Sequence, residues 1–534
     1  MIRLLALAAV AAACTVPAPL DTQAPAAPAP YDIVVVNGTV VDGTGAARYR
    51  ADIGIRDGRI VRVSRASLAG EPARRTIDAT GRVVAPGFID MHAHIEPIFR
   101  LPGAESLLRQ GVTLAVGGPD GGGPWPVGRW LDSVTSTGVG INVATLVGHN
   151  TIRRSVMGTA NRAPTAAELA RMQGMVAQAM GEGAFGLSSG LEYVPGVFAR
   201  GDEVAALARA AADSSGVYTS HVRDEAGGLM ASVRETIEVG RQARIPVVIT
   251  HAKVVGRPNW GRSADMLAAV DAARADGIDA MLDVYPYTAS STGLGILIPS
   301  WALAGGDSAF ARRVRDGATR DSIVRGIIHL VETERGGGDL EFVQFARVPW
   351  NRELEGRRLA DWARSRGLVP SPQVGADLLI EAMLTGGAGA VYHVMSEDDV
   401  RRIMAHPHAT IASDGGLTRP GDGTPHPRAY GTFPRVLARY VREQQVMTLE
   451  QAVMKMTSLP AARLRLGDRG RIAEGLAADL VIFDAATVAD RATFADPHQY
   501  PDGIPFVLVN GVVAVDGGVP TPARAGQALR RPRD

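Results

Sequence analysis

The chain has 534 residues, of which 46% are hydrophobic, and its formal net charge is +1. This length exceeds that of one average domain, and the apolar content is sufficient for a large core, so we expect a large domain with an accessory domain. The nearly neutral charge argues against nucleic acid as a main partner, because phosphate binding requires a basic surface. A charge this small also produces no electrostatic field that would attract the protein to a membrane surface.

The amino terminus has the pattern of a bacterial export signal. Arg3 supplies a positive start, residues 4–13 form an apolar run too short to span a bilayer, and small residues precede Cys14. Residues 11–14 resemble a lipoprotein cleavage box, so we favour lipid attachment to Cys14 over ordinary secretion with cleavage nearby. We therefore expect residues 1–30 to be a signal peptide and a linker. The mature protein would be periplasmic or lipid-anchored to the outer membrane, with membrane contact only through Cys14.

Both ends of the remaining chain have the pattern of short strands. Residues 31–85 contain apolar runs bounded by the turn pairs Asn37-Gly38 and Asp57-Gly58. Residues 461–534 show the same pattern of short apolar runs, with another such turn pair at Asn510-Gly511. We expect the two ends to assemble into one small β-sandwich domain.

Residues 86–460 alternate between apolar runs and helical stretches rich in Ala, Arg and Glu. Eight strands alternating with helices predict an α/β fold of the (β/α)₈ TIM-barrel type, in which catalytic groups lie at the carboxyl ends of the strands. The interval before strand 8 is too long for one crossover, so we expect an insertion at about 288–395, between strands 7 and 8. The predicted strand ends are His94, Asp120, His149, Ser189, His221, His251, Tyr285 and Asp414.

Four histidines at predicted strand ends indicate a metal site. His92 and His94 are two residues apart on a strand, so their side chains point the same way. His221 and His251 each end a buried-strand pattern; either one alone is more simply a core histidine, but together with the first pair they favour metal. The only cysteine is Cys14, so ligands must be His, Asp or Glu, and neutral imidazoles suit zinc.

Asp414 ends another apolar run, where a carboxylate is costly unless it is paired or bound to metal. It could bind metal weakly and take a proton from an activated water. The alternative is that Asp414 caps the segment that follows.

At these residues the chain resembles the amidohydrolase superfamily, through the run 86–94, the two single histidines and Asp414. More specifically it resembles the D-aminoacylase, or N-acyl-D-amino-acid deacylase, family. Segments 148–153, 186–196, 283–287 and 426–433 carry this closer resemblance, which covers nearly everything after residue 31.

The resemblance implies one or two Zn²⁺ ions. His221 and His251 would hold the tighter zinc, and the second position would be lined by His92, His94 and Asp414. Family members commonly supply a further ligand from the strand-2 loop, and in the best-known type it is cysteine. Here Asp120 stands in that Gly-rich loop, which makes a bridging carboxylate and a binuclear site more plausible. The alternative is that Asp120 only shapes the turn.

The resemblance also implies substrate contacts. It assigns Lys253, one of two lysines in the chain, and Arg428 to a substrate carboxylate, which a fixed pair of cations suits. In this arginine-rich chain the alternative for Arg428 is a surface salt bridge. Further candidates are Tyr193 as a donor to the scissile carbonyl, Tyr285 and Ser291 as assisting groups, and His149 as a substrate contact, an outer support or a structural residue.

The resemblance implies an enzyme that hydrolyses the amide bond of N-acyl-D-amino acids with Asp414 as the base, so its partner would be a small molecule. A dipeptidase, another amidase or a cyclic amidase of the same superfamily is the alternative, because the motifs do not encode chirality. Segment 184–190 lacks the strand-4 lysine of many relatives, which argues against a hydantoinase-type site. A remote alternative is a surface-tethered binding protein without catalysis, which would not need an open metal site.

Overall fold

The computed structural model describes residues 30–532 of the chain. The predicted export signal, the lipid site at Cys14 and residues 15–29 lie outside the described residues. Within residues 30–532, no helix combines the length and the apolar character that crossing a membrane would require.

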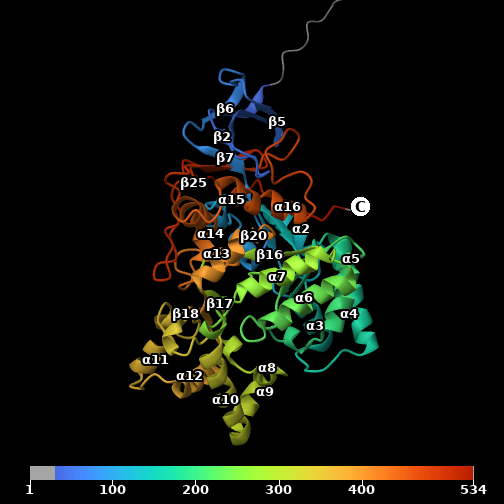
Figure 1. The fold of residues 1–534 in the computed structure, drawn as a ribbon, viewed down its shortest axis with the longest axis vertical. Helices are drawn as coiled ribbons and strands as arrows, with labels where there is room; N and C mark the ends of the chain where they lie inside the picture. Colours follow the sequence, from blue (N-terminus) through green and yellow to red (C-terminus); the bar gives the residue numbers. More distant parts are fainter. Residues whose placement is uncertain (1–29, 533–534) are drawn as a thin grey trace, which may run out of the picture.

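The two ends of the chain build two sheets that lie together in Figure 1. The four-stranded sheet has the order β5-β4-β1-β6, and the seven-stranded sheet has the order β25-β24-β23-β22-β7-β2-β3. Antiparallel pairing of β7 with β22 joins the amino-terminal part to the carboxy-terminal part. The strands are β1 (Tyr31–Val36), β2 (Thr39–Val40), β3 (Tyr49–Arg50), β4 (Asp52–Arg56), β5 (Arg59–Ser64), β6 (Ala73–Asp78), β7 (Val83–Pro86), β22 (Leu480–Phe483), β23 (Phe506–Val509), β24 (Val512–Asp516) and β25 (Val519–Pro520).

Turn chemistry and apolar packing account for these sheets. Asp57-Gly58 connects β4 to β5 and Asn510-Gly511 connects β23 to β24, and all four residues have positive φ, as tight hairpin turns require. One apolar cluster takes side chains from both sheets, including Ile53 and Leu480.

Eleven strand segments of the central region pair in parallel. One sheet has the order β8-β10-β11, and the other has the order β12-β13-β14-β15-β16-β20. β11 and β12 are separated only by Leu146. At the other end of the series, β21 follows β20 and pairs in parallel with β9, the segment that follows β8 in the chain. The segments are β8 (Phe88–Asp90), β9 (Ala93–His94), β10 (Val112–Gly117), β11 (Asn142–Thr145), β12 (Val147–Gly148), β13 (Gly186–Gly190), β14 (Val217–His221), β15 (Val247–Ile249), β16 (Ala280–Val284), β20 (Ala409–Ile411) and β21 (Gly415–Gly416).

Helices follow these strands and pack around them (Figure 1). α4 shows how the sequence sets their ends: Thr165 and Glu168 form a reciprocal cap at its start, and Gly183 with φ 113° ends it. The helices are α1 (Glu105–Leu108), α2 (Val127–Thr137), α3 (His149–Met157), α4 (Ala166–Glu182), α5 (Gly201–Ala212), α6 (Leu229–Ala243), α7 (Ser263–Ala275), α13 (Glu397–Ala405), α14 (Arg428–Arg435), α15 (Leu449–Met456) and α16 (Ser458–Arg463), and a π-helical segment spans Val436–Glu443.

A separate group of elements lies between β16 and α13. It contains the antiparallel sheet β17-β19-β18 and has an apolar core of its own, with Ile327, Phe345 and Leu379 inside. Figure 1 shows its helices at the end of the molecule opposite to the terminal sheets. Its elements are β17 (Ser290–Gly293), α8 (Ser300–Leu303), α9 (Asp307–Arg315), α10 (Gly317–Thr333), β18 (Val343–Arg347), α11 (Leu359–Ser365), α12 (Pro372–Thr385) and β19 (Gly389–Tyr392).

Candidate metal centre and substrate cavity

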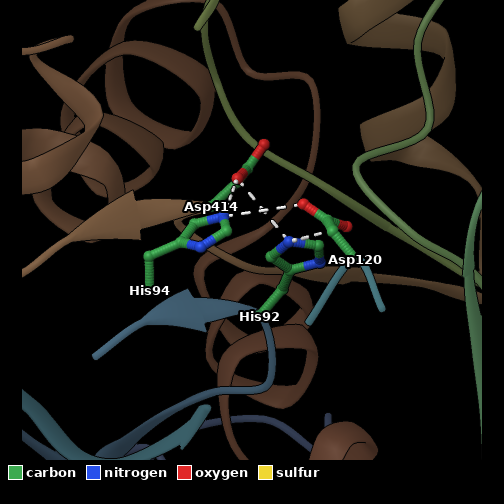
Figure 2. A group of neighbouring side chains, drawn as sticks. All are labelled: His92, His94, Asp120 and Asp414. Atoms are coloured by element: carbon green, nitrogen blue, oxygen red, sulfur yellow. Dashed lines mark hydrogen bonds and ion pairs between the residues drawn. The ribbon is translucent and has the colours of Figure 1, made fainter. Parts of the chain in front are cut away.

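Two histidines and two carboxylates from three strand ends converge on one point, as Figure 2 shows. His92 and His94 follow β8, Asp120 follows β10, and Asp414 follows β20. His94 Nε2 lies 3.2 Å from Asp414 Oδ1 and 3.6 Å from Asp120 Oδ2. His92 Nε2 lies 3.5 Å from Asp120 Oδ1 and 3.6 Å from Asp414 Oδ1. This first group therefore surrounds a space that could hold one cation.

Asp120 also belongs to a second group, with His221 and His251. His251 Nε2 lies 3.2 Å from Asp120 Oδ1, and His221 Nδ1 lies 3.8 Å from the same oxygen. The carboxylate of Asp120 thus stands between the two groups, and each could hold one ion. This is the arrangement expected for a carboxylate that bridges two metals.

The backbone at the site is held in an uncommon conformation. Asp120, His251 and Asp414 have φ of 53°, 36° and 49°, in a region that residues other than glycine seldom adopt. The loop around Asp120 requires glycine as well, because a Cβ on Gly121 would lie 2.4 Å from the side-chain oxygen of Asn150. Such conformations persist where the surrounding structure imposes them, and they concentrate at functional sites.

Unpaired ring nitrogens indicate that these groups suit a metal ion. The side chain of His92 is buried, yet neither of its ring nitrogens makes a hydrogen bond within residues 30–532. Nδ1 of the buried His221 likewise makes no hydrogen bond there. Buried polar atoms are nearly always satisfied, so such atoms beside carboxylates call for another partner. A donor set of imidazole nitrogen and carboxylate oxygen fits zinc.

The electrostatics of the site keep its carboxylates ionised and its tyrosine neutral. Burial raises the pKa of Asp414, but the Arg428 guanidinium and His92 outweigh burial and hold this pKa well below its usual range. Burial, followed by the charge of Asp120, raises the pKa of Tyr193 well above 10. Asp414 is therefore available as a proton acceptor, and the hydroxyl of Tyr193 is available as a hydrogen-bond donor.

A cavity of about 530 Å³ opens over both groups, and Tyr193, Lys253, Ser291 and Arg428 line it. The ring of Tyr193 lies 4.4 Å from that of His221. Lys253 Nζ donates to Glu225 Oε1 at 2.6 Å and lies 2.6 Å from His251 Nδ1. Arg428 Nη1 donates to Asp414 Oδ2 at 2.7 Å, and Nη2 donates to the backbone oxygen of Ser291 at 3.2 Å. Both predicted anchoring cations thus face the cavity, each already paired with a carboxylate.

Two predicted substrate contacts lie outside this cavity. The ring of Tyr285 is buried beneath Lys253 Nζ and Arg428 Cζ, at 5.6 Å and 4.9 Å from its centre, so it supports the two cations from below. His149 is fully buried at the start of α3, where Nε2 meets Glu203 Oε1 at 2.9 Å. His149 therefore lies in a buried network with Glu203 and not among the residues that line the cavity.

Three charged residues of the site escaped the sequence reasoning: Glu192, Glu225 and Arg335. Glu192 lies within the motif 186–196, and Glu225 follows His221 by four residues, so both stand near recognised positions. Arg335 has no such signal, because it comes from the turn after α10, in the separate group of elements between β16 and α13.

Comparison with known proteins places these features in a family. The model of the amidohydrolase family matches residues 75–284 and 326–515, and that of the urease alpha-subunit N-terminal domain matches residues 20–85. Two curated relatives come from Alcaligenes xylosoxydans xylosoxydans. An N-acyl-D-glutamate deacylase is 39% identical over 94% of this chain and 96% of its own, and a D-aminoacylase is 36% identical over 94% and 98%.

Solved structures give the same result. The N-acyl-D-glutamate deacylase of Bordetella bronchiseptica, complexed with zinc and a phosphonate inhibitor, is 38% identical with a TM-score of 0.81, over 94% of this chain and 100% of that one. A D-aminoacylase structure described with a binuclear metal centre is 36% identical with a TM-score of 0.80 over the same shares. The resemblance seen in the motifs is thereby confirmed: the chain belongs to the amidohydrolase family and, within it, to the group of D-aminoacylases and N-acyl-D-amino-acid deacylases.

Proposed function

We propose that this protein is a zinc-dependent hydrolase that cleaves the amide bond of N-acyl-D-amino acids into a carboxylate and a free D-amino acid. The observation that carries the proposal is the position of Asp120 between two groups of histidines beneath a cavity. Identity of 34–39% over 94% of the chain to three curated deacylases of such substrates supports the reaction type.

We also infer how the domains are arranged. The parallel pairing order and the β9–β21 contact favour a closed (β/α)₈ barrel over residues 86–460, with the insertion at about 288–395. The shared apolar cluster favours stacking of residues 31–85 and 461–534 as a β-sandwich. An experimental structure in which the β9 and β21 ends lie apart would contradict the closure.

The residues that would hold zinc are those of the two groups. His221 and His251, with Asp120, would hold one ion, and His92 and His94, with Asp120 and Asp414, would hold a second. When bound, zinc supplies Lewis acidity to the amide carbonyl and to a water molecule.

The remaining chemistry belongs to side chains of this chain. Asp414, kept ionised by Arg428, accepts a proton from the water that adds to the amide carbon. It then gives that proton to the amine nitrogen as the carbon–nitrogen bond breaks, so the carboxylate is regenerated. The neutral hydroxyl of Tyr193 donates to the carbonyl oxygen, whose negative charge grows during the addition.

Lys253 and Arg428 are the anchors for the α-carboxylate of the substrate. An ammonium has three N–H donors and a guanidinium has five, so each cation keeps donors free after its contacts within the protein. The ring of Tyr285 beneath both cations restrains their positions. Ser291 holds Arg428 through its backbone oxygen.

We further propose that the protein acts outside the cytoplasm, as the pattern of residues 1–14 favours, with membrane attachment only through a lipid on Cys14. Fractionation of cells that express the native chain and Cys14→Ala tests this proposal. Membrane recovery of the native chain alone would support the anchor, whereas cytoplasmic recovery of both would contradict export.

The decisive experiment measures zinc content and turnover on the same sample of the full chain. The substrate panel contains N-acetyl-D-amino acids, N-acetyl-L-amino acids, dipeptides and cyclic amides. We expect bound zinc and turnover of the D series. Bound zinc without any D-series turnover would refute the proposed reaction, and dipeptide turnover in its place would identify a peptidase.

A further inference from the structure

Arg335 brings a buried positive charge from the insertion into the metal site. It lies in the turn directly after α10, and its side chain is only 4% exposed. Glycines make this turn possible: a Cβ on Gly336 would lie 2.3 Å from the Cα of Val331, and Gly337 and Gly338 have φ of 65° and 84°. The backbone therefore folds back tightly on α10, and the side chain of Arg335 reaches Glu192 and Glu225, which follow β13 and β14.

The guanidinium of Arg335 joins two carboxylates from different strand ends. Nη2 donates to Glu192 Oε2 at 2.6 Å and to Glu225 Oε2 at 2.5 Å, and Nη1 donates to Ser290 Oγ at 3.0 Å. Two carboxylates in contact with one group, of which Glu225 is buried, would repel each other without a cation between them. Arg335 supplies that cation.

The same carboxylates orient the two histidines of the second group. Glu192 Oε2 accepts from His221 Nε2 at 2.7 Å, which leaves Nδ1 of that ring without a hydrogen bond and facing Asp120. His251 Nδ1 lies 2.6 Å from Lys253 Nζ, which donates to Glu225 Oε1, and 3.2 Å from that same oxygen. The other ring nitrogen of His251 therefore faces Asp120. An outer partner on one nitrogen determines which nitrogen is free to bind a metal.

Glu192, His221 and Glu225 could themselves hold a cation. One ligand atom from each lies within 4.8 Å of the others, so the three have the spacing of a metal site. Two carboxylates and an imidazole are a suitable donor set for zinc. His221 belongs both to this set and to the set around Asp120, but its Nε2 meets Glu192 and its Nδ1 faces Asp120, so an additional ion here would bind the same ring through the other nitrogen.

We propose that Arg335 is a built-in cation that fills this third, latent metal position and thereby keeps His221 turned toward Asp120. Arg335 is thus a positioning residue, contributed by the insertion, that determines where zinc binds. The inference rests on the proposed zinc site, but it concerns the number and place of the ions and not the substrate.

The test compares the zinc stoichiometry of the full chain with that of three variants, in the absence of substrate. Arg335→Ala is expected to bind one more zinc per chain than the native protein and to lose at least tenfold in kcat. Arg335→Lys keeps the charge and is expected to bind the native number. Arg335→Ala combined with Glu192→Gln removes a ligand of the latent site and is expected to lose the extra ion.

Arg347→Ala is the matched control, because Arg347 is an exposed arginine of the insertion that lines the same cavity. It is expected to bind the native number of ions. If Arg335→Ala is unstable, added zinc should raise its Tm more than that of the native chain, since zinc replaces the lost cation. Native stoichiometry in Arg335→Ala, or no stabilisation by zinc in an unstable variant, would overturn the proposal.

Zinc binding is measured without substrate, so failure of the proposed reaction would leave this result intact. A native chain that binds zinc but cleaves no N-acyl-D-amino acid would refute the reaction alone. Gain of an ion in Arg335→Ala would still support the latent site in that case.

Discussion

Replacing Asp120 by Asn separates the two interpretations of this residue. Asn keeps the size of the side chain and tolerates the left-handed backbone at this position, where φ is 53°, so the loop should keep its shape. The substitution removes one negative charge that lies 3.2–3.8 Å from ring nitrogens of four histidines. If Asp120 bridges two ions, both positions lose a ligand at once.

The expected loss of affinity follows from these distances. At about 3.5 Å and an effective dielectric constant of about 20, one unit of charge contributes roughly 5 kcal/mol before solvation is counted. Replacing even an outer partner of a metal ligand costs about 10–100-fold in affinity, so losing a ligand itself should cost at least about 100-fold. That factor corresponds to about 2.8 kcal/mol.

Zinc titration by isothermal calorimetry measures this loss, together with kcat on an N-acetyl-D-amino acid. Asp422→Asn is the matched control, because Asp422 lines the same cavity but belongs to neither group around Asp120. We expect Asp120→Asn to bind fewer ions, at least 100-fold more weakly, and Asp422→Asn to bind zinc as the native chain does. Native affinity and stoichiometry in Asp120→Asn would show that Asp120 only shapes the turn.

Four further outcomes are expected. Asp414→Asn should lower kcat by about 10²–10⁴-fold, the range for a lost general base, and an unchanged rate would exclude that role. Tyr193→Phe should lower kcat by about 10²–10³-fold with little change in KM, because its hydroxyl acts on the developing oxyanion. Chelation should abolish turnover and zinc should restore it; activity that survives metal-free dialysis would contradict the metal site. Burial raises the pKa of Glu334 to about 7, so its ionisation costs stability as pH rises through 7. Glu334→Gln should therefore raise Tm at pH 8.5 but not below pH 4.5, and equal shifts at both would refute this.

Local pattern was sufficient to locate the metal-binding candidates. His92, His94, His221, His251 and Asp414 were found because buried parallel strands appear as apolar runs, and the polar residue that ends each run lies at the same edge of the sheet. The convergence of these side chains with Asp120 follows from that edge. The turn pairs of the terminal strands were equally readable, since Asp-Gly and Asn-Gly adopt positive φ at low cost.

The side-chain partners of two predicted site residues could not be predicted from the sequence. His149 ends an apolar run as His221 does, yet its ring meets Glu203 on a neighbouring helix, and nothing in the local pattern separates the two cases. Tyr285 similarly ends a strand but packs beneath Lys253 and does not face the cavity.

The sequence by itself therefore determined the family, the strand ends and the residue types of the metal centre, because these depend on local periodicity and short motifs. Only the tertiary structure decided which nitrogen of each histidine is free and which charges compensate one another. Arg335 and Glu225 are 110 residues apart, and their contact depends on how the elements between β16 and α13 pack against the parallel strands. Charge pairing over such a separation is set by packing, which no local pattern encodes.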